Sequence, residues 1–305
     1  MIKGDTMEKK SLKEQVKEIT ESLNDNIMNL FESDRFKNYL NVMSRFHNYS
    51  VNNSMLIMMQ KPDATLVAGY NKWQKEFKRN VNRGEKAITI LAPSPYTVTK
   101  KEIDENGEEV EKKVKLMGYR PVKVFDVSQT DGEPLPEIVQ QMNFDVEDFA
   151  VYKETLEHIS PVSIAYQPTG SDANGYYSHA TNSIVVSDTL GEAQTIKTMI
   201  HEIAHAILHN KENGEEMDAD RYTKEVEAES VAYTVCTHFG IDASDYSFGY
   251  IAGWSAGKEL KELKSSMAVI QKTATEVIQS MEEEMEKLYD ERTHDEDREE
   301  SIEMA

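Results

Sequence analysis

The stretch TMIHEIAHAILH, residues 198–209, constrains the fold more than any other part of this 305-residue chain. Its isoleucines and methionine recur every three or four positions, which is typical of an amphipathic helix. At 100° per residue they gather on one side of that helix. The opposite side carries four polar side chains: His201, Glu202, His205 and His209. The sequence therefore predicts a helix that buries one stripe and turns its histidines toward polar surroundings.

Two histidines four residues apart on one helix place their imidazole rings side by side. In the pattern HExxH, formed here by His201, Glu202 and His205, neutral imidazoles bind Zn²⁺ and the glutamate is the general base for water. The alternative is a surface helix with unrelated histidines, because a short motif also matches by chance. We expect a zinc site with His201 and His205 as ligands and Glu202 as catalytic residue.

A catalytic zinc needs a third protein ligand and an open position. The segment YTKEVEAESVAYTVC, residues 222–236, offers three glutamates. On a helical wheel Glu225 and Glu229 lie within the apolar arc, whereas Glu227 lies opposite and is expected to face solvent. Carboxylates on an inward face are costly unless they are paired or bind a metal. We therefore predict Glu225 as the third ligand and Glu229 as the carboxylate that orients a ligand histidine, although these two roles could be exchanged.

Charge divides the chain into two parts. Residues 40–125 carry 15 Lys and Arg against 9 Asp and Glu, whereas residues 126–305 carry 12 against 38. The net charge of −21 therefore hides a basic segment joined to an acidic one. Such an asymmetry means that the total charge does not exclude nucleic acid as a partner.

Hydrophobic patterning divides the chain in the same way and predicts an α+β fold class. Helical patterns come first, strand patterns follow from Ala87, and the turn-rich SQTDGEPLPE, residues 128–137, is the expected boundary. Further helices and a small sheet surround the HExxH helix. The predicted parts are an N-terminal extension (1–24), a first domain (25–132), a second domain (140–250), a long helix (251–289) and an acidic disordered tail (290–305).

The segment NKWQKEFKRNVNRGEK, residues 71–86, interleaves basic and aromatic side chains. Proteins that bind single strands of nucleic acid combine a cationic groove with aromatic stacking platforms. Trp73 fits base stacking and burial in a core equally well, whereas Phe77 is expected to be core. The predicted DNA-binding residues are Lys72, Trp73, Lys75, Lys78, Arg79, Arg83 and Lys86.

The beginning of the chain, MIKGDTMEKKSLKEQ, is charged and lacks the apolar segment of a signal peptide. No apolar run reaches the length of about 18 residues that a transmembrane helix needs. The single cysteine, Cys236, excludes a disulfide framework and is expected to be a core residue. These features predict a soluble, cytoplasmic protein without a membrane partner.

Two sets of motifs resemble known families. HEIAH (201–205) and EVEAESVA (225–232) make the second part similar to zinc-metallopeptidase-like domains of the ImmA/IrrE type. The first part resembles the single-strand-DNA-binding domain of ArdC-type antirestriction proteins. It does so through three pieces: NYSVNNSMLIMMQKP, VAGYNKWQKEFKRNVNRGEKAITILAP and VKVFDVSQTDG.

Together, over about residues 25–240, the pieces resemble the ArdC/LtrC-like architecture of plasmids, conjugative elements and phages. The resemblance implies an N-terminal α+β domain that binds single-stranded DNA. It also implies a zincin-like metallopeptidase domain, with a small sheet and the HExxH helix, that uses Zn²⁺ as in gluzincins. The implied role is the protection or establishment of incoming mobile-element DNA.

A non-enzymatic interpretation stays open. In it the chain binds single-stranded DNA and holds a structural or vestigial zinc. A structural zinc is normally closed by four protein ligands, so a ligand role for His209 would favour this interpretation. We otherwise expect His209 to be a helix-end residue. The peptide substrate is not indicated by the sequence.

Overall fold

The structure, a computed structural model, describes residues 10–103, 109–135, 149–170, 173–209 and 220–303. The chain forms two compact units. The first comprises Met1–Met28 and Asn52–Pro134, and the second comprises Asn29–Val51 and Leu135–Ala305. Both units combine helices with small sheets, which confirms the predicted α+β class.

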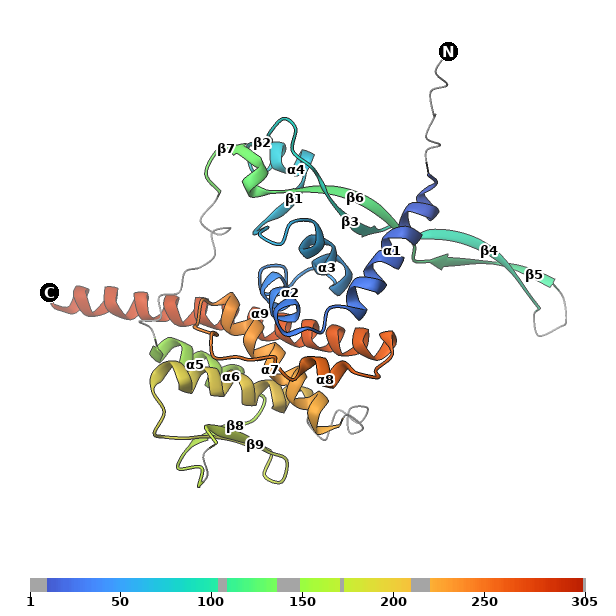
Figure 1. Cartoon of the computed structure of the whole chain (residues 1–305). Coiled ribbons are helices and arrows are strands. Elements are labelled where there is room, and N and C mark those ends of the chain that lie inside the picture. The colour runs from blue at the N-terminus through green and yellow to red at the C-terminus, as the bar shows by residue number, and fades with distance from the viewer. Residues whose placement is uncertain (1–9, 104–108, 136–148, 171–172, 210–219, 304–305) are drawn as a thin grey trace, which may run out of the picture. The chain divides into compact units, whose positions relative to one another are not determined.

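The first unit is built on antiparallel strands and short helices (Figure 1). Its central sheet has the order β1-β6-β3, and β2–β7 and β4–β5 form two separate two-stranded sheets. Its helices are α1 (Leu12–Met28), most of α3 (Val51–Gln60), α4 (Tyr70–Lys75) and the 3₁₀ turn η1 (Val127–Gln129). Its strands are β1 (Val67–Gly69), β2 (Arg79–Val81), β3 (Ile88–Pro93), β4 (Tyr96–Ile103), β5 (Glu109–Leu116), β6 (Tyr119–Asp126) and β7 (Thr130–Gly132).

Two carboxamides of α3 complete the outer edge of β3. The Asn53 side chain donates to the Leu91 carbonyl at 3.0 Å and accepts from the Leu91 N–H at 2.9 Å. Gln60 makes the same pair of bonds with the backbone of Thr89, both at 2.9 Å. An exposed edge strand invites pairing with another chain, so these amides stabilise the sheet and close one of its edges.

The segment FDVSQTDG holds the first unit together. The buried Asp126 carboxylate accepts from the N–H groups of Thr65 and Leu66 at 2.8 and 3.1 Å, and from Ser128 in its own turn. Gln129 donates to the Lys86 carbonyl at 2.9 Å. Two loops far apart in the sequence are thus fixed by one turn, and this part of the motif has a structural role.

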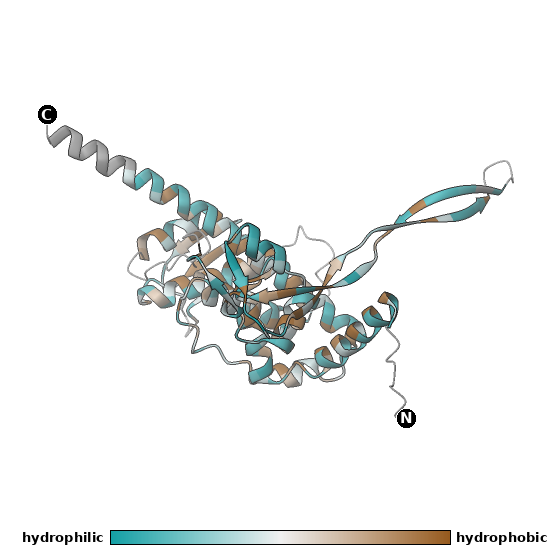
Figure 2. Cartoon of the chain, turned by 90° about the horizontal axis from the view of Figure 1, so that it is seen from above, coloured by the Kyte–Doolittle hydropathy of each residue, from teal (hydrophilic) through white to brown (hydrophobic). Residues whose placement is uncertain are grey.

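Strands β4 and β5 form a long two-stranded ribbon that runs away from β3 and β6 (Figure 1). Figure 2 shows that most of the ribbon is hydrophilic, whereas β3 and β6 include more apolar residues. Lysines and glutamates face each other across it, as in the pair Lys101–Glu109 at 2.8 Å. The ribbon therefore contributes exposed, charged surface and little core.

The second unit places one long helix between a small sheet and other helices (Figure 1). Helix α6 contacts β9 and β10 on one side and α7 and α9 on others. In the sheet, of order β8-β10-β9, β10 is parallel to β8 and antiparallel to the edge strand β9. Its strands are β8 (Ser163–Tyr166), β9 (Gly175–Ser178) and β10 (Ser183–Val186). The helices of the second unit are α2 (Ser33–Arg45), α5 (Phe149–Ile159), α6 (Glu192–Leu208), α7 (Arg221–His238), α8 (Ile251–Ser255) and α9 (Leu260–Glu303).

A polar cluster joins α2, α7 and α9 at the end of α7. The His238 imidazole lies 2.9 Å from the Ser44 carbonyl and 3.0 Å from the Glu282 carboxylate. His47 packs edge-on against it, with ring centroids 5.0 Å apart. The His47 carbonyl accepts from the Thr275 hydroxyl at 2.8 Å. Segment 29–51 is thereby bonded to the C-terminal helices.

Several predicted boundaries differ from these units. The segment 29–51 was expected within a first domain of residues 25–132, but its contacts place it in the second unit. The expected helix 251–289 consists of two helices, because α8 ends at Ser255 and α9 begins at Leu260. Helix α9 also continues to Glu303, through residues that composition indicated to be disordered. The start of this chain, residues 1–9, lies outside the described residues.

Among the described residues, no helix combines the length and the apolar composition needed to cross a membrane.

Candidate metal centre and nucleic-acid surface

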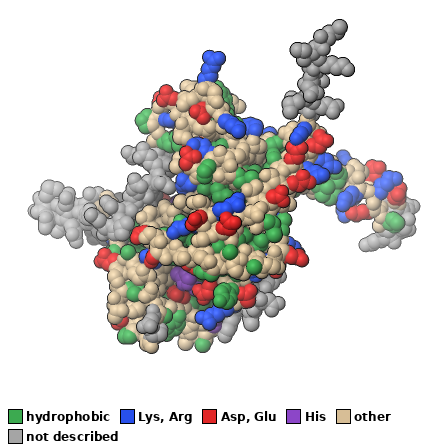
Figure 3. Space-filling model, viewed as in Figure 1, with side chains coloured by type: hydrophobic (Ala, Val, Ile, Leu, Met, Phe, Trp, Pro, Cys, Tyr) green, Lys and Arg blue, Asp and Glu red, His purple; other side chains and the backbone are tan. Residues whose placement is uncertain are grey.

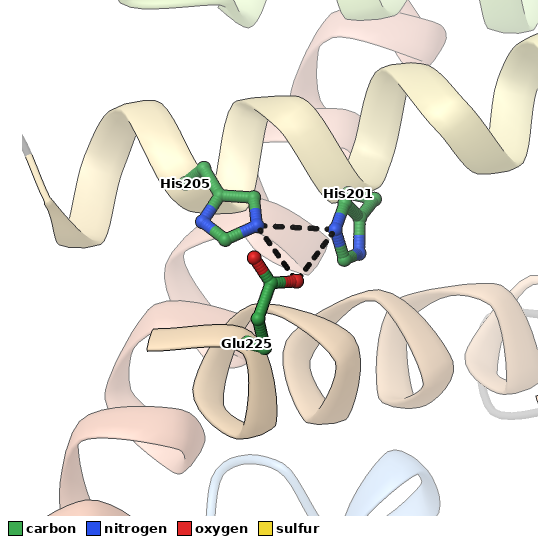
Figure 4. A group of neighbouring side chains, drawn as sticks. All are labelled: His201, His205 and Glu225. Carbon is green, nitrogen blue, oxygen red and sulfur yellow. Dashed lines mark hydrogen bonds and ion pairs between the residues drawn. The ribbon is translucent and has the colours of Figure 1, made fainter. Parts of the chain in front are cut away.

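Three side chains from α6 and α7 converge on one point (Figure 4). The Nε2 atoms of His201 and His205 lie 3.1 Å apart, and Glu225 Oε2 lies 3.8 and 3.6 Å from them. Among the described residues these three form the group of ligand-type atoms that could hold a metal ion. Bond lengths of about 2.0–2.1 Å in a tetrahedral zinc site place neighbouring ligand atoms roughly 3.3 Å apart. The donor set and its spacing therefore fit a zinc ion.

The electrostatics of the group also suit a cation. Burial lowers the pKa of His201 below its usual value, and the neighbouring His205 lowers it further. A neutral imidazole is the form that binds metal. The hydrogen-bonding His205 imidazole lowers the pKa of the Glu225 carboxyl, which favours the ionised carboxylate. Both shifts favour the forms of His201 and Glu225 that bind a metal ion.

Glu202 lies on α6 between the two histidines and is buried, with 7% of its surface exposed. Burial raises its pKa to about 7, although the charge of His205 and the Tyr177 N–H oppose the shift. A carboxyl group with a pKa near the working pH can both accept and release a proton. This is the property that a general base beside a metal requires.

The edge strand β9 comes close to α6 because it contains Gly175. A Cβ atom at this position would come within 2.6 Å of the Thr198 methyl group on α6 and 2.8 Å of the Val185 carbonyl. Any larger side chain would push β9 away from α6. The glycine therefore sets the distance between the strand and the helix that carries the histidines.

The start of α7 fixes the position of Glu225. The Asp220 carboxylate caps this helix by accepting from the Thr223 N–H at 2.9 Å. The Thr223 hydroxyl accepts in turn from the Trp254 indole N–H at 3.0 Å. Because Glu225 follows one turn after the cap, its side chain is aimed at α6, and half of it is exposed in the cleft.

The predicted surface position of Glu227 is wrong. Glu227 is only 7% exposed, and Ser230 and Thr234 on the same side of the helix are fully buried. Helix α7 packs against α6, α2 and α9, so no complete side of it faces solvent. A helical wheel finds an apolar arc, but it cannot show that neighbours also cover the polar side.

Glu229 lines the cleft beside His201. Its carboxylate accepts from the Tyr250 hydroxyl and from the Ser247 N–H. Burial and the charge of Glu225 raise its pKa to about 7. Within the described part of the chain its hydrogen bonds go to these two groups, and the predicted role in orienting a ligand histidine stays a prediction.

His209 is the last residue of the histidine stripe and forms the C-cap of α6, as expected for a helix-end residue. Its Nε2 lies 3.3 Å from the Lys224 carbonyl, and its ring centroid lies 5.5 Å from that of His205. It is not among the described residues that could share a metal ion with His201 and His205. Cys236, predicted to be core, is fully buried.

Two cavities flank the metal group. One, of about 610 Å³, is lined by β9 and by the cationic side chains Arg221 and Lys224. The other, of about 270 Å³, lies toward the beginning of α6. His201 and Glu202 line both of them. A chain that crossed the metal group would therefore find space on either side of it.

The predicted DNA-binding residues of the first unit divide into two groups. Trp73 is fully buried, and its indole N–H donates to the Phe125 carbonyl at 2.8 Å. The stacking role for Trp73 is therefore wrong, because a ring without exposed surface cannot contact a base. Arg79 also makes structural bonds, to the hydroxyl and carbonyl of Thr130 at 2.8 and 2.9 Å. The exposed cations are Lys72, Lys75, Lys78, Arg83 and Lys86.

Exposed tyrosines of the first unit were not predicted. Tyr96 and Tyr119 flank the base of the β4–β5 ribbon and are 52% and 54% exposed, and Tyr70 at the start of α4 is 52% exposed. Figure 3 shows Lys and Arg side chains on this part of the chain, with Asp and Glu side chains among them. Strand alternation places Tyr119 and Lys123 on one face of β6. The signal was present in the sequence as aromatic residues bordering a charged hairpin.

The fold and the site define a class: a two-unit α+β chain with an HExxH helix and a third glutamate in one unit and a row of exposed lysines in the other. Comparisons with known families agree with both halves. Residues 9–125 match the N-terminal domain of anti-restriction factor ArdC, and residues 160–238 match the IrrE N-terminal-like domain, a family of M78 peptidases. The chain thus carries an ArdC-type N-terminal domain followed by an IrrE-like domain of the M78 peptidase family.

One relative matches almost the whole length of this chain. An uncharacterised protein of Bacillus anthracis is 30% identical over an alignment of 323 residues, which covers 93% of this chain and 54% of the relative. This chain thus spans about half the length of that relative.

Two similar solved structures are of the antirestriction ArdC protein from plasmid R388. The metal-free one is 22% identical, covers 78% of this chain and 86% of its own, and has a TM-score of 0.46. The Mn(II)-bound one is 17% identical, covers 88% and 97%, and has a TM-score of 0.48.

Proposed function

We propose that this chain binds single-stranded DNA with its first unit and hydrolyses peptide bonds at a zinc centre in its second. The observation that carries the enzymatic part is the convergence of His201, His205 and Glu225 beside a buried Glu202. Three ligands leave a position open for water or substrate, which distinguishes a catalytic zinc site from a structural one with four. The two cavities beside the group supply room for a substrate.

In this proposal His201, His205 and Glu225 hold the zinc ion. A zinc ion held there supplies a Lewis acid that polarises the scissile carbonyl and makes the attacking water more acidic. The Glu202 carboxylate accepts the proton of that water and later donates it to the leaving amine. Its raised pKa supports both steps, because the protonated form is then accessible near neutral pH. Strand β9 lies alongside and limits the cleft.

The DNA-binding part rests on the exposed cations and on the ArdC-type domain that contains them. Lys72, Lys75, Lys78, Arg83 and Lys86 supply phosphate contacts. The exposed rings of Tyr70, Tyr96 and Tyr119 replace Trp73 as stacking platforms, since a base stacks on any accessible aromatic face. Arg79 instead holds β2 against β7.

We further propose an antirestriction role in a bacterial cytoplasm, in which the protein protects or establishes incoming DNA of a mobile element. Support comes from the match to the N-terminal domain of an anti-restriction factor. Single-stranded DNA is the expected partner of the first unit, and a peptide of unknown sequence is the expected substrate of the second.

Metal analysis of the purified full chain tests the enzymatic proposal. We expect about one zinc ion per chain, and loss of it in His201→Ala, His205→Ala and Glu225→Ala. Glu202→Gln should retain the metal and the fold but lose peptide hydrolysis. Glu227→Ala, which removes another carboxylate of α7, should retain zinc, and circular dichroism shows whether this variant of a buried residue is folded. Zinc loss in Glu227→Ala but not in Glu225→Ala would refute the ligand assignment, and unchanged cleavage by Glu202→Gln would refute the mechanism.

A further inference from the structure

The cavity of about 270 Å³ at the beginning of α6 differs from an ordinary apolar side-chain pocket. None of the described residues that line it carries an aliphatic side chain, in contrast to most ligand pockets. Besides Gly175 and the aromatic Tyr246, its wall is formed by amides, hydroxyls and charged groups, including Asn174, Gln194, Lys197, Thr198, Glu229 and Asp245. Because His201 and Glu202 also line it, a side chain bound there lies next to the metal centre.

Lys197 supplies a fixed hydrogen-bond donor in this cavity. The residue lies one helical turn before His201 and is only 8% exposed. Its ammonium group donates to the Asp245 carboxylate at 2.7 Å, which is its hydrogen bond within the described part of the chain. An ammonium group has three N–H donors, so others are available to a ligand. The ion pair also holds the lysine in place, since a buried charge is tolerated only when it is paired.

Acceptors face the same space. The Asp245 side chain is 55% exposed, and its carboxylate has more lone pairs than the bond from Lys197 uses. Glu229, on α7, lines the cavity from the other helix while the Tyr250 hydroxyl donates to it. Donors and acceptors are therefore both presented to whatever enters.

We propose that this cavity is a substrate pocket that selects a carboxamide side chain, glutamine or asparagine, next to the cleaved bond. The inference rests on the proposed peptidase function. A carboxamide carries a carbonyl acceptor and an NH₂ donor on one planar group. Its carbonyl accepts from the Lys197 ammonium, and its NH₂ donates to the carboxylate of Asp245 or Glu229.

Other side chains satisfy only part of this lining. A carboxylate side chain of the substrate bonds to Lys197 but is repelled by Asp245 and Glu229. An ammonium group bonds to these two carboxylates but is repelled by Lys197. An aliphatic side chain displaces water from polar groups and leaves them without partners. Sites built to hydrogen-bond a substrate reject analogues that lack the bonding group far more strongly than apolar pockets reject a missing methylene.

A positional-scanning peptide library tests this pocket with two readouts on the full, zinc-loaded chain. Mass spectrometry of the digest gives the residues on either side of the bonds that are cut. Retention of the same library by the Glu202→Gln protein reports binding without turnover. We expect Gln and Asn to exceed Leu, Glu and Lys at one position by at least about tenfold in both readouts.

Two variants connect the preference to the pocket. Lys197→Met keeps the length of the side chain but removes the donor and leaves a half-exposed carboxylate. Asp245→Asn removes the negative charge but keeps a side-chain carbonyl that can accept from Lys197. Both should reduce the Gln and Asn preference. Lys272→Met, which removes an exposed lysine on α9, should leave it unchanged. Circular dichroism and metal content show whether each variant is folded.

The outcomes separate this inference from the proposed function. Selective retention of Gln peptides without any cleavage by the wild-type protein overturns the peptidase proposal but supports the pocket. Preference for Leu, Glu or Lys at the position overturns the pocket and leaves the peptidase intact. A Gln preference that survives both Lys197→Met and Asp245→Asn, or no selective retention at all, also overturns the pocket.

Discussion

The two units hold their charged side chains in different ways. In the first unit the lysines and the arginine that are proposed to bind DNA are exposed, and their proposed partner is a flexible polyanion outside the protein. In the second unit the charged groups nearest the histidines are held by close neighbours: Glu225 lies beside His201 and His205, Lys197 is paired with Asp245, and Glu229 accepts from Tyr250. A metal site depends on a few atoms at fixed distances, whereas a nucleic-acid surface depends on the sum of many weak contacts. The two proposed activities should therefore respond very differently to single substitutions.

The largest difference in the effect of a substitution on stability should appear between a buried and an exposed aromatic residue of the first unit. Trp73→Ala should destabilise the protein by about 3–5 kcal/mol, because it opens a cavity and leaves the Phe125 carbonyl without its donor. Urea unfolding followed by circular dichroism measures this change in stability. Stability equal to that of the wild-type protein would mean that Trp73 does not lie in the core and could stack on a base.

Tyr119→Ala is the matched exposed change. It should leave stability almost unchanged but weaken binding of single-stranded DNA by about 1–3 kcal/mol, the range for one stacked base. Fluorescence anisotropy with a labelled oligonucleotide measures the affinity. Affinity equal to that of the wild-type protein in both Tyr119→Ala and Tyr96→Ala would exclude the base of the ribbon as a stacking platform.

Removing a lysine should change the salt dependence of DNA binding more than it changes the affinity at any one salt concentration. The slope of log affinity against log salt should become shallower by roughly 0.7 for each phosphate of a single strand that the protein no longer neutralises. Lys75→Ala is expected to show this change. Arg79→Ala should instead lower stability, because its guanidinium group bonds to Thr130 in the neighbouring strand. A change of slope at unchanged stability in Arg79→Ala would reverse this distinction.

A smaller effect is expected on the stability of the second unit when the pH is lowered. Burial lowers the pKa of His47, and the nearby His238 lowers it further, while the Ser44 carbonyl and Glu282 oppose the shift. The folded state therefore disfavours protonation, so stability is complete above the usual histidine pKa of about 6.5 and falls as pH drops below it. His47→Gln should flatten this dependence. Parallel pH profiles of unfolding for the two proteins would show that His47 is not responsible.

The metal group was the more predictable of the two sites. His201, Glu202 and His205 share one helix, so their relative positions follow from helical geometry alone. Glu225 lies on another helix, and the sequence supported it through the apolar arc of α7. That argument also placed Glu227 in solvent, which is wrong, because the contacts of α7 with α2 and α9 are tertiary and leave no periodic signal.

The surface of the first unit could be predicted only in outline. Composition indicated a basic region, and its lysines are exposed. It could not distinguish Trp73 from Tyr119, because burial depends on whether Phe125 and the sheet cover the ring. The pairing of Lys197 with Asp245 could likewise not be predicted from the sequence, because 48 residues separate the partners and only the fold brings them together. Sequence periodicity gives the face of an element but not the elements that cover it.

The separation of the two activities has one direct test, which is the affinity of the full chain for single-stranded DNA with and without its metal. Wild-type protein before and after chelation, and the His205→Ala variant, are compared by fluorescence anisotropy at one salt concentration. If DNA is bound by the first unit alone, the three affinities are the same while metal content falls to zero in the second and third samples. Loss of DNA binding on removal of the metal, in both the chelated protein and His205→Ala, would contradict two independent sites.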